Sequence, residues 1–104
     1  MENIKYKVRG QALEYVMPKE IDHHVAQDIC KELDMLIDAY GIKELVLDFE
    51  STEFMDSSGV GIMIGRSKVM QFRNGKVYVK NMGKRVDTVF RSAGLHKIIQ
   101  IMEV

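Results

Sequence analysis

The chain is 104 residues long, which allows one modest hydrophobic core, so we take residues 1–104 as a single domain. Hydrophobic residues make up 46% and charged residues 29% of the sequence, and these proportions exclude a disordered chain. Fifteen basic residues balance fifteen acidic ones without a block of like charge, which argues against nucleic acid or an anionic membrane as a partner.

The apolar runs and the cysteine content point to the cytoplasm. No stretch approaches the roughly 18 consecutive apolar residues of a membrane span, and the first residues lack the pattern of a signal peptide. The single cysteine, Cys30, excludes an internal disulfide and suits a reducing compartment. We therefore expect a cytoplasmic protein in which Cys30 is a small core residue or a half-buried thiol.

The first elements are two short strands joined by a tight turn. Residues 4–8 alternate apolar and basic side chains, the period-two pattern of a strand with one wet face. Gly10 fits the position of a two-residue hairpin turn that needs a positive φ. Residues 12–17 then return as an antiparallel strand, which Pro18 ends because proline offers no N–H.

A long amphipathic helix follows the hairpin. Asp22 is its expected N-cap, and Gly41 is its stop signal. Between them, apolar side chains recur at helical spacing, which predicts the face that packs on the sheet. These positions are Val25, Ile29, Leu33, Leu36, Ile37 and Tyr40.

The middle of the chain reads as a buried strand, a short loop and a glycine-rich helix. Residues 45–49 are an apolar run with branched side chains, and the helix should cover about residues 58–72. The loop between them carries three consecutive helix-capping residues, at positions 56–58. Glycines at 59, 61 and 65 weaken a helix by about 1 kcal/mol each. We expect that close approach of the helix to the sheet, or of a partner to the loop, compensates for this loss of helix stability.

The last elements complete an α/β fold. Residues 76–80 alternate as a strand, 85–92 form a helix capped by Gly94, and the tail 97–102 is expected to be an edge strand. We expect a mixed sheet of about four or five strands with three or four helices, in which helical crossovers make the later strands parallel. Asp22, Asp56 and residues 81–85 should then share one edge, where strand carboxyl ends meet helix N-termini.

The sequence disfavours four enzymatic or ligand-binding motifs. A hydrolase elbow needs Gly-x-Ser-x-Gly, and neither Ser57 nor Ser58 has both glycines. The glycines of the helix have the wrong spacing for a dinucleotide fingerprint, and no phosphate-loop motif is present. His23 and His24 are adjacent, so their side chains diverge, and no second ligand cluster accompanies them. We expect no enzyme activity, no metal and no cofactor.

The serine pair at 57 and 58 has two readings. Both residues can be plain helix caps, because their oxygens accept hydrogen bonds from first-turn N–H groups. The alternative is phosphorylation, which adds about −1.5 to −2 charges and three acceptor oxygens. A helix N-terminus tolerates that charge, whereas an apolar or acidic partner surface does not. One covalent event can then abolish docking without unfolding the domain.

Three segments carry a resemblance to a known family. Residues 54–66 (FMDSSGVGIMIGR) resemble the signature of the bacterial anti-sigma factor antagonists, the stand-alone STAS domains. Residues 20–26 (EIDHHVA) are similar to the second landmark of that family, and 85–95 (RVDTVFRSAGL) to its third helix and the exit from it. The similarity covers essentially the whole chain.

The resemblance implies a partner-switching mechanism. The unphosphorylated protein binds an anti-sigma factor that is also an ATP-dependent serine kinase, and so frees a sigma factor for transcription in a sporulation or stress circuit. The kinase phosphorylates the serine directly after the aspartate, here Ser57, and a serine phosphatase resets the switch. The match makes Asp22 and Arg66 docking residues and Ser58 a cap or auxiliary contact. The remaining expected partner-binding positions are His23, Asp56 and Gly59.

The chain departs from the family pattern at two places. Lys19 stands where members usually carry a glycine, and Gly83 with Lys84 replaces the prolines often found before the third helix. Neither touches Ser57, but both bear on which partner is bound. A STAS module of another signalling scaffold or of a lipid-trafficking system is the alternative function.

Overall fold

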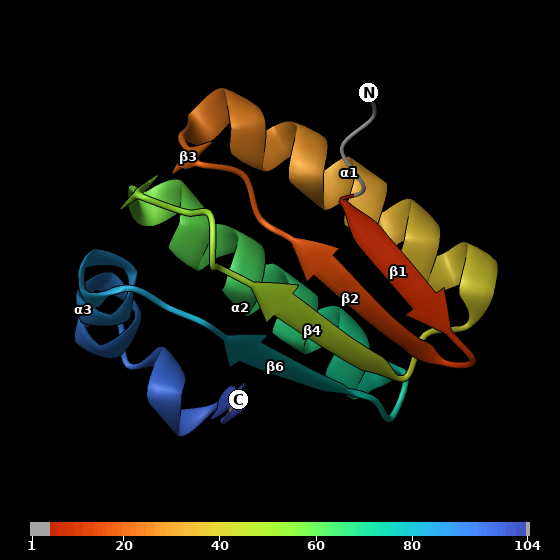
Figure 1. Ribbon diagram of the computed structural model, residues 1–104. Helices are drawn as coiled ribbons and strands as arrows, with labels where there is room; N and C mark the ends of the chain where they lie inside the picture. Colours follow the sequence, from red (N-terminus) through yellow and green to blue (C-terminus); the bar gives the residue numbers. More distant parts are fainter. Residues whose placement is uncertain (1–4, 104) are drawn as a thin grey trace.

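A computed structural model describes residues 5–103 and shows a five-stranded sheet in the order β1-β2-β4-β6-β7 (Figure 1). β1 pairs antiparallel with β2, and every later neighbour in the sheet runs parallel. This confirms the expected mixed α/β architecture. The strands are β1 Tyr6–Arg9, β2 Ala12–Val16, β4 Glu44–Asp48, β6 Lys76–Lys80 and β7 Gln100–Ile101.

The expected hairpin is present. Arg9 pairs with Ala12, which leaves a two-residue loop, and Gly10 has a φ of 59°. Of the predicted first strand, Ile4 lies outside the described residues. The central strand β4 begins and ends one residue earlier than predicted. These are shifts at element ends, and they leave the face of each side chain unchanged.

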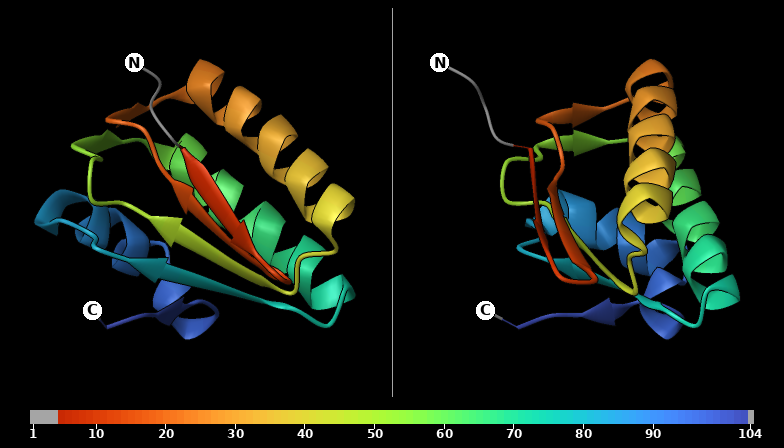
Figure 2. Two further views of the ribbon diagram at one scale, coloured as in Figure 1. Left: turned by 45° about the vertical axis from the view of Figure 1, so that its right-hand side comes forward. Right: turned by 90° about the vertical axis from the view of Figure 1, so that its right-hand side faces the viewer.

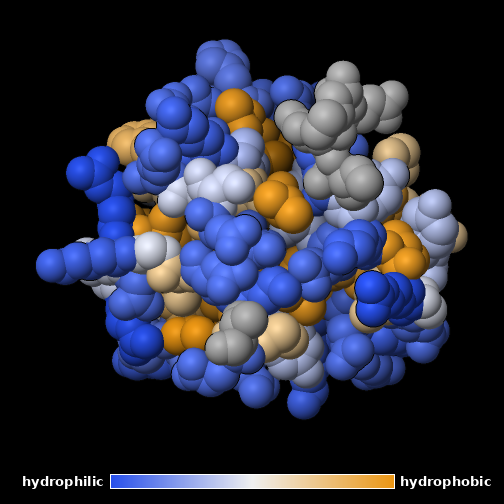
Figure 3. Space-filling model, viewed as in Figure 1, coloured by the Kyte–Doolittle hydropathy of each residue, from blue (hydrophilic) through white to orange (hydrophobic). Residues whose placement is uncertain are grey.

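Two long helices pack side by side on one face of the sheet (Figure 2). They are α1, His23–Tyr40, and α2, Ser57–Phe72. α3, Lys84–Ser92, lies at the end of the sheet where α2 begins. The opposite face of the sheet, toward the viewer in Figure 3, is mostly hydrophilic with small apolar groups between charged side chains. The molecule thus has one core, between the sheet and its helices.

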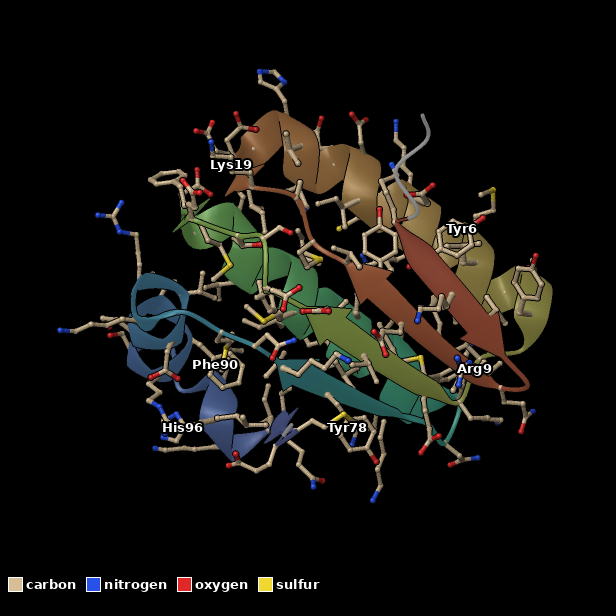
Figure 4. The ribbon with its side chains drawn as sticks, viewed as in Figure 1. Tyr6, Arg9, Lys19, Tyr78, Phe90 and His96 are labelled. Atoms are coloured by element: carbon tan, nitrogen blue, oxygen red, sulfur yellow. The ribbon has the colours of Figure 1, made fainter. Side chains whose placement is uncertain are left out.

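That core draws on every layer. Leu13 and Tyr15 of β2, Leu45 and Leu47 of β4, and Phe90 of α3 are all almost completely buried (Figure 4). α1 contributes Ala26, Ile29, Leu33, Leu36 and Ile37. The prediction that Tyr40 belongs to this face is wrong, because it stands in the last turn of α1 and is 52% exposed.

A second, two-stranded sheet was not predicted. β3 (Glu20–Ile21) pairs parallel with β5 (Phe54–Met55), beyond the carboxyl ends of β2 and β4. Thr52, in the loop before β5, donates its hydroxyl to the carbonyl of Pro18 at 2.8 Å. These bonds connect the loop that precedes α1 to the loop that precedes α2.

The tail of the chain is only partly the strand that was expected. Leu95–Lys97 form a 3-10 turn, entered through Gly94 with a φ of 76°. The strand β7 begins later and pairs with Tyr78 and Val79 of β6. Leu95 and Ile99 are buried on either side of the turn, so apolar packing holds the tail against the sheet edge.

Candidate functional site

The N-termini of α1 and α2 lie next to each other on one edge of the molecule. Pairing of β3 with β5 sets Ile21 opposite Met55, so the next residues, Asp22 and Asp56, emerge together. The Asp56 N–H donates to the Ile21 carbonyl at 3.2 Å. Two positive helix ends therefore point out of the same edge.

An aspartate caps each of these helices. The Asp22 carboxylate accepts the Val25 N–H at 2.9 Å, and the Asp56 carboxylate accepts the Ser58 N–H at 2.8 Å. The first result confirms the predicted cap of α1. The second means that α2 begins at Ser57, one residue before the predicted start.

The interpretation of Ser57 and Ser58 as caps is therefore wrong. Asp56 supplies the capping oxygen, and the two serines stand inside the first turn of α2. Ser57 is exposed and Ser58 is half-buried. The arrangement leaves the Ser57 hydroxyl outside the capping bond, at the positive end of a helix, where a reagent can reach it.

The three glycines of α2 stand in different surroundings. A Cβ on Gly59 would lie 2.2 Å from Cγ of the buried Met55, so Gly59 lets the first turn of α2 pack against β5. A Cβ on Gly61 or on Gly65 would meet nothing within 4 Å. The expected close packing within the domain is confirmed for Gly59 and wrong for the other two.

A groove of about 540 Å³ lies between α1 and α2 and reaches the serine site. Its residues on α1 recur at helical spacing along one edge of the buried stripe, to which Ala26 belongs. Only His23 and Ser58 among its lining were predicted site residues. The lining consists of His23, Ala26, Gln27, Cys30, Lys31, Ser58, Gly61 and Ile62. Cys30 is half-buried there, in agreement with one of its two expected states.

A second cleft, of about 690 Å³, borders the same edge. Glu20 and Phe54, from the small sheet, line it together with Lys84 and Arg85 at the start of α3. This confirms that the three segments predicted to share an edge do so. Phe54 is 42% exposed there and adds an apolar side chain beside the charged Glu53, Lys84 and Arg85.

His23 begins α1 and is exposed at the mouth of the groove. Its ring centroid lies 6.0 Å from that of His24, and its Nε2 lies 3.4 Å from Nε2 of Gln27. Within residues 5–103, no three histidine, cysteine or acidic side chains gather as metal ligands. The same residues contain no helix both long and apolar enough to span a bilayer.

Arg66 does not gather with the other predicted site residues. It stands nine positions after Ser57, about 13 Å along the helix. Its side chain is only 11% exposed, and its Nε lies 3.2 Å from Oδ1 of Asp34 on α1. The contact is an ion pair without hydrogen-bond geometry, since Nε and Nη1 are buried and make no hydrogen bond within the described chain. Arg66 therefore joins α2 to α1, one helical turn beyond the groove-lining residues Ile62 and Cys30.

The fold and the site define a small α/β domain that presents two capped helix N-termini on one open edge. Residues 3–104 match the profile of the STAS domain family. An anti-sigma F factor antagonist of Paenibacillus polymyxa is 31% identical over 84 residues, which cover 81% of this chain and 72% of that relative. The chain therefore belongs to the STAS domain family.

Solved structures agree with this assignment. The unphosphorylated form of the anti-sigma factor antagonist SpoIIAA is 26% identical, with a TM-score of 0.83 over 94% of this chain and 88% of its own length. The phosphorylated form of SpoIIAA, described as a Bacillus cell fate determinant, is 25% identical, with a TM-score of 0.74 over 94% and 91%. One relative of the same fold thus exists in two phosphorylation states.

Proposed function

We propose that this protein is an anti-sigma factor antagonist that phosphorylation of Ser57 switches off. The unphosphorylated form binds an anti-sigma factor and thereby releases a sigma factor. The anti-sigma factor is also a kinase, which transfers the γ-phosphate of ATP to the Ser57 oxygen and releases ADP, and a serine phosphatase removes the phosphate again. The observation that carries the proposal is the exposed Ser57 in the first position of α2, outside the cap that Asp56 provides.

The charges around Ser57 explain why one phosphate suffices. The N-terminus of α2 stabilises an anion through its dipole and its free N–H groups, so the domain stays folded. Asp22 and Asp56 already place two carboxylates at this edge. Two further negative charges make the edge strongly anionic, and a partner surface that had accepted a neutral hydroxyl then meets repulsion and a desolvation penalty.

We assign the docking surface to the residues that surround this hydroxyl. Asp22 and His23 present the start of α1, while Asp56, Ser58 and Gly59 shape the start of α2. Gly59 acts through the backbone, because it is buried and lets the first turn of α2, which carries Ser57, pack against Met55. All five act by direct contact or by holding Ser57 in place, and none performs a catalytic step.

Arg66 can contact a partner only if its side chain breaks the ion pair with Asp34. Asp34→Asn removes the opposing charge and keeps Arg66, so direct docking by Arg66 predicts unchanged or tighter binding. If Arg66 only holds the two helices together, Asp34→Asn and Arg66→Gln should weaken binding to a similar, small extent. Affinity measurement of both variants by calorimetry separates the two roles.

The phosphorylation site is tested by incubating the protein with the cognate anti-sigma factor and ATP, followed by peptide mass spectrometry. We expect one phosphate, on Ser57. Ser57→Ala should accept none, and the matched variant Ser58→Ala should still accept one. Phosphate on Ser58 or elsewhere would refute the assignment.

The switch itself is tested through binding. Ser57→Asp introduces about half of the phosphate charge at the same place, and we expect at least a hundredfold loss of affinity for the anti-sigma factor. Ser57→Ala should bind as the wild type does, and circular dichroism should show the same fold for both variants. A Ser57→Asp protein that bound as tightly as wild type would defeat the proposal.

A further inference from the structure

Gly61 is a helical glycine for which the domain itself gives no reason. It lies in the interior of α2 and is exposed, and a side chain added there would meet nothing within 4 Å. Glycine in such a position destabilises a helix relative to alanine. Gly59, by contrast, is required by its contact with Met55. The open space at Gly61 is therefore available to a partner, as is that at Gly65, and the groove distinguishes the two positions.

The space at Gly61 belongs to the groove between α1 and α2. Ile62, which is 1% exposed, lines the groove beside Gly61, and Ala26 and Cys30 line it from α1. The exposed surface of this lining is mainly apolar. The groove also includes Ser58, the neighbour of the proposed phosphorylation site, so it is continuous with the proposed docking edge.

We propose that this groove accepts a large apolar side chain of the anti-sigma factor, and that Gly61 is the residue that determines its fit. The inference rests on the proposed function and names the contact that the partner makes. Without a Cβ at Gly61, the partner backbone can approach α2 closely enough to lower that side chain onto Ile62. Lys31, also in the lining, favours an acidic residue next to the apolar one on the partner.

Graded substitutions at Gly61 test the proposal with purified, unphosphorylated protein and the purified cognate anti-sigma factor. We expect roughly tenfold weaker binding for Gly61→Ala and more than a hundredfold for Gly61→Leu, because each fills part of the groove. The same Gly61→Ala change should raise the melting temperature by about 4 °C, because alanine favours the helix. Higher stability with lower affinity is a result that misfolding cannot produce.

Gly65→Ala is the matched control. Gly65 is also a helical glycine with open space at its Cβ position, one turn further along α2, but it is not part of the groove lining. We expect the same rise in melting temperature and unchanged binding. Equal losses of affinity in Gly61→Ala and Gly65→Ala would overturn the assignment to the groove.

Cys30 provides a second measurement, because it is the only cysteine of the chain. Bound anti-sigma factor should slow the reaction of Cys30 with N-ethylmaleimide at least tenfold, and alkylated protein should bind at least tenfold more weakly. Cys30→Ser should bind with the same affinity before and after treatment with the reagent. Alkylation at an unchanged rate in the complex would show that the groove stays empty, and would refute the proposal.

These outcomes are distinct from a failure of the proposed function. If wild-type protein binds the anti-sigma factor and Ser57→Asp does not, the switch stands, and a Gly61→Leu variant that binds normally overturns the groove contact alone. If wild-type protein is a dimer in solution and Gly61→Leu is a monomer, the occupant is a second copy of this chain, and the proposed partner contact is wrong.

Discussion

The helices α1 and α2 start at the same edge and cover the same face of the sheet, yet they are built differently. α1 buries five aliphatic side chains, is capped by Asp22 and ends at Gly41, whose N–H donates to the carbonyl of Ile37. α2 contains three glycines and buries only Gly59, Ile62, Met63 and Met70. Local sequence stabilises α1 at both ends and along its length, whereas α2 depends on the contacts of a few side chains.

The contrast shows how one layer can combine stability with exchange of partners. Helix propensity is sacrificed in α2 at Gly61, where the groove needs space, while the buried Met63 and Met70 hold that helix to the sheet. α1 needs no such compromise, because side chains and no glycine line the groove on its side. If this division is right, changes at the buried positions of α1 should act on folding, and changes at the glycines of α2 should separate folding from binding.

The largest effect is expected from the core face of α1. Leu33 is completely buried, and Leu33→Ala should lower the free energy of unfolding by about 3 kcal/mol through lost transfer energy and a residual cavity. Urea denaturation followed by circular dichroism measures it. Met35→Ala is the control on the same helix, since Met35 is 60% exposed, and its change should stay within about 0.5 kcal/mol. Similar losses for both variants would contradict the assigned face.

The glycines of α2 should respond to alanine with opposite signs. Gly59→Ala forces the new Cβ against Met55, so we expect a net destabilisation of about 1–2 kcal/mol after the gain in helix propensity. Gly65→Ala has free space and should stabilise the protein by roughly 0.5–1 kcal/mol. Thermal melts of the two variants side by side decide it. Stabilisation by both would mean that Met55 moves aside without strain.

The main layers of this fold could be predicted from the sequence because they repeat. Alternation marked β1 and β6, an apolar run marked β4, helical spacing marked α1, and Asp22 and Gly41 marked its ends. The pair β3 and β5 could not be predicted, because two-residue strands have no period. They exist because the Lys19 carbonyl accepts the Glu53 N–H at 2.8 Å and the Phe54 N–H at 3.2 Å, contacts between distant parts of the chain.

The sequence predicted several residues of the candidate edge, but neither its geometry nor most of the groove lining. Three adjacent residues, Asp56, Ser57 and Ser58, can each cap a helix, and side-chain preference does not choose among them. Pairing of β5 with β3 fixes the chain at Met55 and makes Asp56 the cap. The place of Arg66 depends in the same way on the crossing of α2 with α1, which sets it against Asp34. Tertiary contacts therefore determine both the cap of α2 and the position of Arg66.

The anchor of α1 on the sheet should respond to alkaline pH. Tyr15 of β2 donates its hydroxyl to Glu32 of α1, and burial first, then this hydrogen bond, raises the pKa of Tyr15 well above 10.0. Tyr15→Phe should cost about 1.5 kcal/mol of stability at neutral pH, the range for a hydrogen bond to a charged group. α2 has no counterpart to this bond within the described residues.

The sign of the pH effect follows from the raised pKa of Tyr15. Above pH 10 the unfolded chain releases the Tyr15 proton while the folded chain keeps it, so stability falls as the pH rises. The contribution is fully present below pH 10. We expect wild-type stability to fall more steeply than that of Tyr15→Phe between about pH 10 and 11. Parallel stability curves for the two proteins would exclude Tyr15 as the group responsible.

The smallest effect separates the two roles of Asp22. Asp22→Ala removes the cap of α1 and should lower stability by about 1 kcal/mol, whereas Asp22→Asn keeps a capping oxygen and should change it by only a few tenths. If Asp22 docks through its charge, both variants weaken binding to the anti-sigma factor. If it only starts the helix, Asp22→Asn binds as wild type does. Calorimetric affinities alongside thermal melts give both numbers for each protein. A docking role for Asp22 would show that α1 also gives up part of its outer face to the partner, and the division between a stable α1 and an exchanging α2 would then hold only for their interiors.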